Sequence, residues 1–530
     1  MSKHKQTKPQ QNPFDNARGH PPLTRIDRWL FYVTASLTGA TVMMIELLGT
    51  RIIGPYYGVS MIVWSSLLST ALLALSVGYL VGGRLADTAP WLRLSHILLV
   101  TAVLIGVIPL LSKPVQLASN GLGLRGGALL SALVLFTPCL LTLGMVGPYV
   151  IKTVTQGLER VGRTAGTVYA ISTLGSVLGT LVLGFFLLPL FGTEIIVISL
   201  SLLMLVMAFV LSLYERQRLK SGHSLLVWGV STGVLAAALL LGVGSTVGTR
   251  HYPGSEVVFE AETHYGWVRV IDQPERGIRW LMSGGSTIGA EDLETGLGLL
   301  GYQQVVGQLP RFHPAGDSAL LVGLGSGHLV NAYAGFGVRT DAIEIDPAVA
   351  HAAQAYFSFQ PTGDVVVGDA RYRIQQLNRR YDLIVHDCFT GGAEPIHLLS
   401  LEMFQTLKAR LKPGGVLALN FVGLTHEGQQ APVEAVANTL DQVFEHRRTF
   451  VSSPEATFND FVFVVSDAPL ELSGPEPPRR WLEAREVNVE GDTKLVITDD
   501  FNPLETLHIA KAEYYRDLLI DRVGESVLFY

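Results

Sequence analysis

Seven apolar stretches dominate the first half of the chain, and they constrain its fold more than any other feature. Each approaches the roughly 20 residues that a helix needs to cross the hydrocarbon core of a membrane. Only a helix or a closed barrel satisfies its backbone polar groups there. We therefore predict a multispan α-helical membrane domain of about seven helices over residues 29–247. The stretches lie near residues 29–49, 61–83, 94–112, 126–150, 166–191, 193–214 and 224–246.

The composition agrees with a membrane protein. Hydrophobic residues make up 48% of the chain and charged residues only 16%, and the mean hydropathy is +0.35. An ordinary globular enzyme is less apolar than this. The net charge of −6 comes without an extended basic patch, which argues against a nucleic-acid partner. Cys139 and Cys388 stand in unrelated contexts and indicate neither a disulfide framework nor a metal site.

The basic residues give the chain a predicted orientation. Residues 1–28 form a polar, basic tail that we expect to be disordered, with no cleavable signal peptide. Lysine and arginine gather in this tail and after the second, fourth and sixth apolar stretches, which predicts a cytoplasmic N-terminus in a cell (inner) membrane. Seven spans would place the second half of the chain outside, where a cytosolic metabolite is not expected. The membrane face of that half stays open.

The second half reads as a globular α/β region. Residues 254–310 alternate apolar and polar side chains between turn signals, which favours a small antiparallel β subdomain. Strand and helix patterns then alternate over residues 311–470, as is typical of a doubly wound α/β domain with a mostly parallel sheet. The segment "SGPEPPRR" (473–480) has the composition of a linker. Residues 471–530 are predicted to form a C-terminal appendage.

A glycine loop opens the α/β region. "GLGSGH" (323–328) follows an apolar strand and precedes a helix, so its glycines allow a tight turn and a close approach of a ligand. The spacing G-x-G-x-G differs from the G-x-G-x-x-G of dinucleotide-binding proteins. The loop alone is a weak signal of ligand binding.

Three carboxylates strengthen that signal. Glu344, 21 residues after Gly323, ends the next predicted strand, and Asp369 and Asp387 end the two after it. The carboxyl ends of parallel strands meet at one edge of the sheet, where such sheets bind ligands, and a carboxylate at position 344 can accept hydrogen bonds from both hydroxyls of a ribose. One such residue is as often only a helix cap or a turn residue. All three beside a glycine loop favour a ligand site.

These motifs resemble those of the spermidine synthases, or polyamine aminopropyltransferases, and in particular the group fused to a multispan membrane domain. The resemblance covers about residues 255–470 and is carried by "YQQVVGQLPRFHP" (302–314), "VGLGSGH", "IEID", "VGDA" and "YDLIVHDCFTGG". It implies a Rossmann-like domain of the S-adenosylmethionine (SAM)-methyltransferase type behind a small N-terminal β subdomain. It also implies transfer of an aminopropyl group from decarboxylated SAM to a diamine, with release of methylthioadenosine.

The resemblance implies a role for each matching residue. Asp387 would deprotonate and orient the attacking amine, and Tyr302 would lie near that amine. An amine must lose a proton before it attacks, and a nearby carboxylate can accept that proton. Glu344 would hold the ribose hydroxyls and Asp369 the adenine amino group. The residues implied to bind the adenosyl co-substrate are Gly323, Gly325, Ser326, Gly327, Glu344, Asp369 and Ala370.

The chain departs from the family at acidic positions. Ser326 and Thr390 stand where the family has carboxylates, and Ser283 and Thr287 stand where it has Asp and Gln. Carboxylates hold a cationic diamine through charge-assisted hydrogen bonds, so their loss weakens its recognition. We therefore expect an altered acceptor or a weak activity.

Two other functions remain open. A SAM-dependent methyltransferase shares the sheet and the glycine loop and would release S-adenosylhomocysteine. A non-catalytic transporter or sensor would bind a nucleoside without turnover, and Glu46, deep in the first apolar stretch, would then be functional rather than paired. The expected partners are an amine, an adenosyl co-substrate and the lipid bilayer, and no permanently bound cofactor. The family also suggests a homodimer.

Several smaller features carry paired interpretations. Asp499 and Asp500, in "TDDFNPLE" (498–505), would form either a lid over the site or a capped surface turn. His328 would either contact the ligand or pack in the structure. His386 and Cys388 flank Asp387, and packing is the favoured role for both because no Cys-His-Asn pattern accompanies the cysteine.

Overall fold

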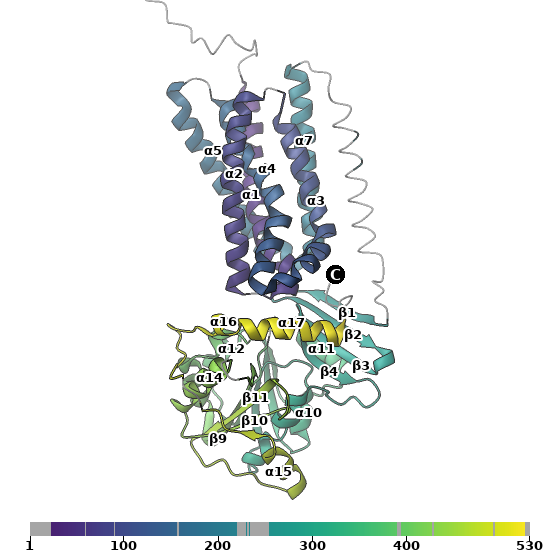
Figure 1. Cartoon of the computed structure of the whole chain (residues 1–530), viewed down its shortest axis with the longest axis vertical. Coiled ribbons are helices and arrows are strands. Elements are labelled where there is room, and N and C mark those ends of the chain that lie inside the picture. The colour runs from purple at the N-terminus through teal and green to yellow at the C-terminus, as the bar shows by residue number, and fades with distance from the viewer. Residues whose placement is uncertain are drawn as a thin grey trace, which may run out of the picture. The chain divides into compact units, whose positions relative to one another are not determined.

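The computed structural model describes residues 23–58, 60–89, 91–155, 158–219, 229, 233, 254–389, 394–426, 429–490 and 493–524. The chain divides into two compact units (Figure 1). The helical unit comprises Met1–Ile52, Ser65–Ala118 and Leu129–Gly248, and the α/β unit comprises Ile53–Trp64, Ser119–Ala128 and Thr249–Tyr530.

Long apolar helices make up the helical unit. Among the described residues, five helical stretches are long and apolar enough to cross a membrane, and the longest of them, Leu94–Val154, has 61 residues. The first six predicted stretches coincide with these helices, whereas the seventh, 224–246, lies outside the described residues apart from 229 and 233. The helices are α1 (Arg25–Tyr57), α2 (Met61–Thr88), α3 (Leu94–Ser119), α4 (Gly123–Val154), α5 (Val161–Val182), α6 (Leu188–Leu190) and α7 (Thr193–Leu219).

The third and fourth predicted stretches are less separate than the sequence suggests. Helix α3 continues through Pro109 and Pro114 to Ser119. Only the three-residue 3-10 turn η1 (Asn120–Leu122) then separates it from α4. A membrane helix tolerates proline when its neighbours satisfy the freed backbone groups, so these prolines do not mark the helix end.

Small residues bring α1 and α5 together, as their spacing predicts. A Cβ atom added to Gly175 would lie 2.1 Å from the carbonyl oxygen of Ser36, and one added to Gly179 would lie 2.8 Å from the Cβ of Ala40. The hydroxyl of Ser176 donates a hydrogen bond of 2.9 Å to the carbonyl of Gly39. Close backbone approach of this kind is the main source of helix association in lipid.

A small antiparallel sheet begins the described part of the α/β unit after residue 253. Its four strands follow one another in the order β1-β2-β3-β4. Gly284, with φ +57°, lies in the tight turn between β3 and β4, where Ser283 pairs with Ser286. This sheet confirms the predicted β subdomain. The strands are β1 (Glu256–Glu262), β2 (Trp267–Gln273), β3 (Ile278–Ser283) and β4 (Ser286–Asp292).

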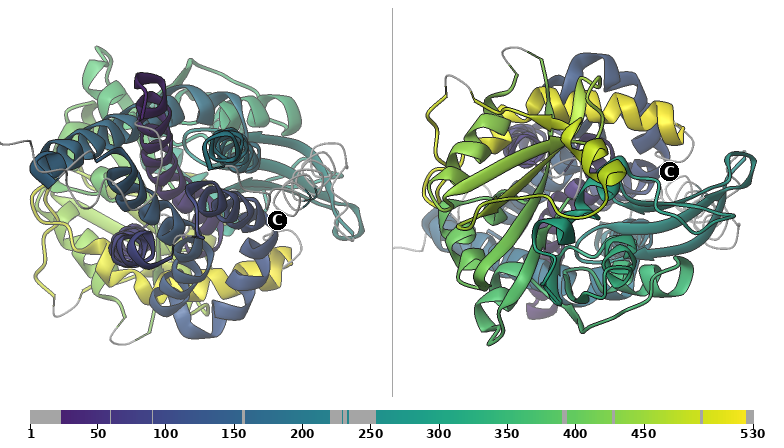
Figure 2. Two further views of the ribbon diagram at one scale, coloured as in Figure 1. Left: turned by 90° about the horizontal axis from the view of Figure 1, so that it is seen from above. Right: turned by 90° about the horizontal axis from the view of Figure 1, so that it is seen from below.

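An eight-stranded sheet forms the centre of the α/β unit, with the small sheet beside it (Figures 1 and 2). Its order is β12-β10-β11-β9-β8-β5-β6-β7, and the run from β9 to β7 is parallel. The parallel run confirms the predicted doubly wound fold. The strands are β5 (Ser318–Val322), β6 (Arg339–Glu344), β7 (Val365–Val367), β8 (Tyr381–His386), β9 (Leu411–Leu424), β10 (His446–Val451), β11 (Phe458–Ser466) and β12 (Glu486–Val487).

The other edge of this sheet is antiparallel. Strand β11 pairs with both β9 and β10 in antiparallel register. Only six residues separate β10 from β11, which suits an antiparallel hairpin and is too short for the crossover that a parallel pair requires. Strand β11 thereby lies inside the sheet, next to β9.

Helices cover both faces of the eight-stranded sheet. One apolar core joins its strands to α9, α10 and α11, and another joins them to α12, α13 and α14. Ile497 and Leu504, from the predicted appendage, are fully buried in the second core. The helices are α9 (Gly301–Val306), α10 (His328–Ala334), α11 (Pro347–Tyr356), α12 (Ala370–Gln376), α13 (Leu401–Lys408), α14 (Ala431–Asp441), α15 (Glu476–Glu483), α16 (Leu504–Leu507) and α17 (Ile509–Val523).

The segment with the composition of a linker is partly helical. Helix α15 begins at Glu476, directly after Pro475, with proline in its first turn. Proline is favoured at the first position of a helix because the N–H that it lacks has no intrahelical partner there. The linker interpretation of residues 473–480 was wrong for this reason.

Candidate functional site

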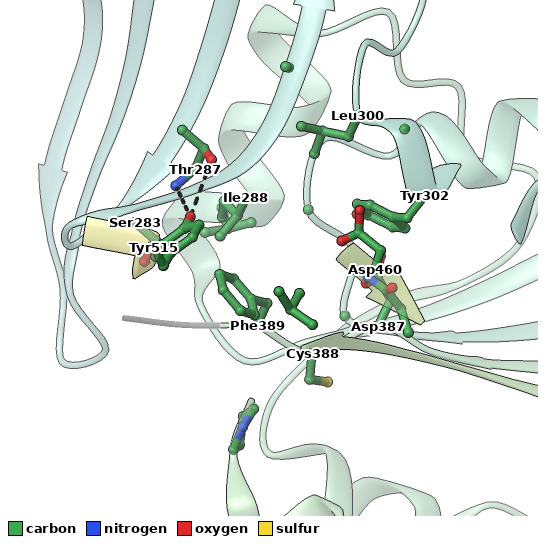
Figure 3. Close-up of a pocket in the computed structure, with 18 of the residues that line it drawn as sticks. Ser283, Thr287, Ile288, Leu300, Tyr302, Asp387, Cys388, Phe389, Asp460 and Tyr515 are labelled. Atoms are coloured by element: carbon green, nitrogen blue, oxygen red, sulfur yellow. Dashed lines mark hydrogen bonds between the residues drawn. The ribbon is translucent and has the colours of Figure 1, made fainter. Parts of the chain in front are cut away.

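A cavity of about 840 Å³ lies in the α/β unit, where the carboxyl ends of the parallel strands meet the small sheet and α17 (Figure 3). The strand ends supply Gly323, Glu344 and Asp387, as expected from the sequence. The opposite wall comes from β3, β4 and the C-terminal helix. Of the nine predicted site residues, those that line the cavity are Tyr302, Gly323, Gly325, Glu344, Asp369, Ala370 and Asp387.

The first glycine of the loop is required by its surroundings. Gly323 has φ +94°, and a Cβ atom there would lie 2.1 Å from the carbonyl oxygen of Asp387. Glycine adopts this backbone conformation without strain. Any other side chain would clash with the backbone of Asp387, which follows β8. The loop after β5 is therefore held directly against the chain that carries Asp387.

The later loop residues turn away from the cavity. Gly325 lines the cavity, whereas Ser326 and Gly327 do not. The Ser326 hydroxyl donates a hydrogen bond of 2.7 Å to His328 Nδ1, and His328 Nε2 donates one of 3.1 Å to Glu291. The side chains of Ser326 and His328 thus fix the loop to the small sheet. Of the two interpretations left open for His328, packing in the structure describes its position.

Glu344 anchors the glycine loop as well as facing the cavity. Its Oε2 accepts a hydrogen bond of 3.0 Å from the backbone N–H of Leu324, and its Oε1 accepts one of 3.0 Å from Asp346. Burial raises the pKa of Glu344 above its usual range, and these backbone donors oppose that shift. A carboxylate has about four acceptor sites, so Glu344 retains capacity for two further donors.

Asp369 caps a helix and also lines the cavity. Its Oδ1 caps α12 by accepting a hydrogen bond of 2.8 Å from the backbone N–H of Tyr372. Its Oδ2 lies 3.9 Å from His397 Nε2. Asp369 and the following Ala370 both line the cavity. Capping therefore uses one carboxylate oxygen and leaves the other outside the helix cap.

Asp387 and Tyr302 lie together at one side of the cavity (Figure 3). Asn420 donates a hydrogen bond of 3.0 Å to Asp387 Oδ1. Burial raises the pKa of Asp387 to about 6, although the neighbouring Asn420 and Tyr302 side chains lower it. A carboxylate with this pKa is suited to accept a proton near neutral pH.

Sequence reasoning missed several cavity residues. Asp460, at the start of β11, lies beside Tyr302 and Asp387. The one available signal was an acidic residue at the start of an otherwise apolar strand, "FNDFVFVVS". Tyr515 and Arg522 reach the cavity from α17, in the predicted appendage. No local motif marks them.

Of the two residues beside Asp387, His386 packs in the core and Cys388 lines the cavity. His386 is fully buried and donates a hydrogen bond of 3.0 Å to the carbonyl of Leu398, and burial lowers its pKa to about 4. Burial raises the pKa of the Cys388 thiol well above its usual range. Because the thiolate is the nucleophilic form, Cys388 is not activated for attack.

The segment with Asp499 forms a turn rather than a cavity wall. The backbone N–H of Thr498 donates to the carbonyl of Phe501 at 3.0 Å, and the Thr498 hydroxyl accepts from Phe501 at 3.1 Å. Asp499 pairs with Arg371, whose Nη1 lies 2.9 Å from its Oδ1. Neither Asp499 nor Asp500 lines the cavity. The turn interpretation thus describes this segment.

Comparisons with known proteins point to two related activities. The model of a family of S-adenosyl-L-methionine-dependent methyltransferases matches residues 347–420. A polyamine aminopropyltransferase from Vibrio vulnificus is 37% identical over 116 residues, 21% of this chain and 39% of that protein. A probable polyamine aminopropyl transferase from Bifidobacterium longum is 23% identical over 282 residues, 48% of this chain and 62% of that protein.

A third relative has another kind of activity in its name. An N-terminal histidine N-methyltransferase from Emericella nidulans is 32% identical over 193 residues, 32% of this chain and 34% of that protein. The chain spans less than two thirds of the length of each of these three relatives. Two of these relatives are named aminopropyltransferases, and the chain is similar to spermidine synthase-like proteins over part of its length.

Proposed function

We propose that the protein is a membrane-bound aminopropyltransferase that transfers an aminopropyl group from decarboxylated SAM to an amine. The observation that carries this proposal is the position of Asp387. It faces the cavity, accepts a hydrogen bond from Asn420, lies beside Tyr302 and has a pKa of about 6. A base with these properties can accept the proton that an acceptor ammonium group must lose before its nitrogen attacks.

The adenosyl co-substrate would occupy the strand-end side of the cavity. Gly323 and Gly325 would lie against it, the remaining acceptor sites of Glu344 would take the ribose hydroxyls, and Oδ2 of Asp369 would take the adenine amino group. Ser326 and Gly327 would act indirectly, by shaping the loop. The co-substrate enters and leaves with each turnover and is not a permanent cofactor.

The transfer balances with one base. An acceptor ammonium gives a proton to Asp387, and the freed nitrogen lone pair attacks the aminopropyl carbon next to the sulfonium. The new N–C bond forms as the S–C bond breaks, and the electron pair of that bond returns to sulfur as methylthioadenosine leaves. Asn420 orients the carboxylate by its hydrogen bond, and Tyr302 lies beside it. Bringing the two reactants into line supplies much of the rate.

SAM-dependent methyl transfer is the second candidate. It is favoured by the methyltransferase family model over residues 347–420 and by the N-methyltransferase relative. Asp387 would serve an N-methylation in the same way, by accepting the proton of the acceptor amine. The co-substrate and its product separate the two reactions, since methyl transfer leaves S-adenosylhomocysteine.

The helical unit would anchor the enzyme in a membrane. Its apolar helices are long enough to cross one. From the distribution of basic residues we propose a multi-pass protein of the cell (inner) membrane with its N-terminus in the cytoplasm. A homodimer is proposed from the family resemblance.

Calorimetric binding tests the adenosyl site. The full chain in detergent is titrated with decarboxylated SAM, SAM and methylthioadenosine. We expect decarboxylated SAM and methylthioadenosine to bind more tightly than SAM. A clear preference for SAM would favour methyl transfer, and the absence of binding by all three would contradict both reactions.

A further inference from the structure

The acidic residues near the acceptor side of the cavity are confined to one place. Asp387 and Asp460 lie together beside Tyr302, whereas Ser283, Thr287 and Tyr515 lie at the other side (Figure 3). The second group offers hydroxyls only. The backbone N–H of Thr287 donates a hydrogen bond of 3.2 Å to the Tyr515 hydroxyl, which holds β4 to α17.

Asp460 is prepared to hold a cation together with Asp387. The Ser452 hydroxyl donates a hydrogen bond of 2.9 Å to Asp460 Oδ2. Within the described residues, no hydrogen bond to Asp460 Oδ1 is present. Burial and then the charge of Asp460 raise the pKa of Asp387, so the two carboxylates repel one another. An ammonium group placed between them removes that repulsion.

The nearby lysine pairs with another carboxylate. Lys511 Nζ lies 2.5 Å from Glu394 Oε2, and both side chains are at most 3% exposed. Neither residue lines the cavity. The charge of Lys511 also acts on Asp460, but from outside the cavity, so the cavity carboxylates remain accessible to a ligand.

Two arginines, Arg276 and Arg522, also line the cavity. Arg276 Nη1 donates a hydrogen bond to the backbone carbonyl of Arg522, which places the two residues together. Within the part of the chain that the structure describes, neither guanidinium forms an ion pair with a carboxylate. Arg522 also interacts electrostatically with Asp460 and Tyr515, so its charge acts on the acceptor side of the cavity. A second ammonium group would meet these charges and the hydroxyls of Ser283, Thr287 and Tyr515.

We infer that the acceptor is an amine with a single cationic end, whose ammonium group lies between Asp387 and Asp460 and whose other end is neutral or anionic. This inference rests on the proposed transferase function, because it names the acceptor of that reaction. A diamine would leave its second ammonium group without a carboxylate and near two guanidinium groups. Repulsion of this kind is a common source of specificity.

Three ligands with the same four-carbon chain test the inference. Butylamine, 4-aminobutyrate and 1,4-diaminobutane are titrated into the full chain in detergent, with saturating methylthioadenosine in the adenosyl site. We expect at least one of the first two to bind roughly tenfold more tightly than the diamine, as the loss or gain of one charge-assisted contact implies. Tightest binding by the diamine would overturn the inference.

Two variants locate the charges. Asp460→Asn should weaken the better single-ended amine by roughly tenfold or more, while Asp364→Asn, the same change at an exposed site paired to Arg339, should leave it unchanged. Arg522→Gln should reduce the difference in affinity between the diamine and that amine. Unaltered amine binding in Asp460→Asn, with the thermal midpoint retained, would contradict the role of Asp460. If Asp460→Asn does not fold, Ser452→Ala replaces it, because this change keeps the carboxylate and removes its hydrogen bond. In that case, an unaltered order of affinity of the three ligands in Arg522→Gln overturns the inference.

Binding is read without turnover, so the two proposals fail separately. Binding of the single-ended amines without methylthioadenosine formation from decarboxylated SAM would remove the transferase function and leave the ligand preference. Turnover of 1,4-diaminobutane in preference to the other two would retain the transferase function and remove the inference.

Discussion

Tyr302 and Asp387 lie together at one side of the cavity, although β5, β6, β7 and β8 separate them in the chain. Tyr302 is the second residue of α9, and Asp387 follows β8. The two side chains meet only when α9 packs against the sheet. Folding of the doubly wound domain thus brings the proposed base and its tyrosine neighbour into one cavity.

Loss of the proposed base should stop the chemistry while the fold is kept. We expect Asp387→Asn to lower kcat by about 10²- to 10⁴-fold, because general-base catalysis typically contributes that much. Affinity for methylthioadenosine should change little, since Asp387 lies on the acceptor side. Steady-state kinetics and calorimetry measure the two quantities, with Asp364→Asn as the matched control. A kcat within a few fold of the wild type would remove Asp387 as the base.

The activity should decrease as the pH falls below about 6. Burial raises the pKa of Asp387 to about 6, so the carboxylate accepts a proton above that pH and is already protonated below it. Asp460 raises this pKa and Tyr302 lowers it. The acidic limb of kcat should therefore move to lower pH in Asp460→Asn and to higher pH in Tyr302→Phe. A pH profile of each variant checks both directions, and a limb that stays in place in both would contradict the assignment.

The close approach of the glycine loop to Asp387 predicts a structural cost for a methyl group. Gly323→Ala combines φ +94° with a Cβ contact of 2.1 Å to the carbonyl oxygen of Asp387. Gly337→Ala is the control, because Gly337 has φ +77° but no atom within 4 Å of an added Cβ. Backbone strain of this type costs about 1–3 kcal/mol. Thermal unfolding should show a clearly larger loss of stability for Gly323→Ala. Equal losses in the two variants would mean that the loop moves to accommodate the methyl group without cost.

The two roles of Asp369 can be separated by substitution. Asp369→Ser retains a side chain that caps α12, whereas Asp369→Ala removes the cap at a cost of about 1 kcal/mol. Both remove the carboxylate from the cavity. We expect both to weaken methylthioadenosine binding and only the alanine variant to lower the thermal midpoint. Normal binding in the serine variant would reduce Asp369 to a helix cap.

The buried ion pair between Lys511 of α17 and Glu394 should contribute strongly to the stability of the fold. Lys511→Met leaves Glu394 buried without its cation, and breaking a buried pair in this way costs about 3–5 kcal/mol. The double variant Lys511→Met, Glu394→Gln should recover part of that loss because the uncompensated charge is gone. Comparison of the thermal midpoints of the single and the double variant measures this recovery. A double variant that is less stable than the single one would contradict it.

The strand-end residues could be predicted because their positions depend on local pattern. An apolar run that ends in a glycine turn or a carboxylate places that residue at the carboxyl edge of a parallel sheet, and Gly323, Glu344 and Asp387 lie there. The direction of each loop residue could not be predicted in this way. Ser326 and Gly327 face away from the cavity because the turn into α10 directs them toward His328 and Phe359.

The other wall of the cavity depends on long-range packing. Asp460 faces the cavity because β11 inserts between β9 and β10 in antiparallel register. Tyr515 and Arg522 reach it because Lys511 fixes α17 through Glu394, more than 100 residues away in the chain. No short motif carries that information. Hence the strand-end side of the cavity could be predicted from the sequence, and the wall formed by β11 and α17 could not.

Identification of the adenosyl products in two parallel reactions tests the central claim most directly. The full chain in detergent is incubated with decarboxylated SAM and, in parallel, with SAM, each with the amine that binds most tightly, and the adenosyl products are identified by mass spectrometry. The account predicts methylthioadenosine and an aminopropylated amine from decarboxylated SAM, and neither from the Asp387→Asn variant. Formation of S-adenosylhomocysteine from SAM, without methylthioadenosine from decarboxylated SAM, would contradict it.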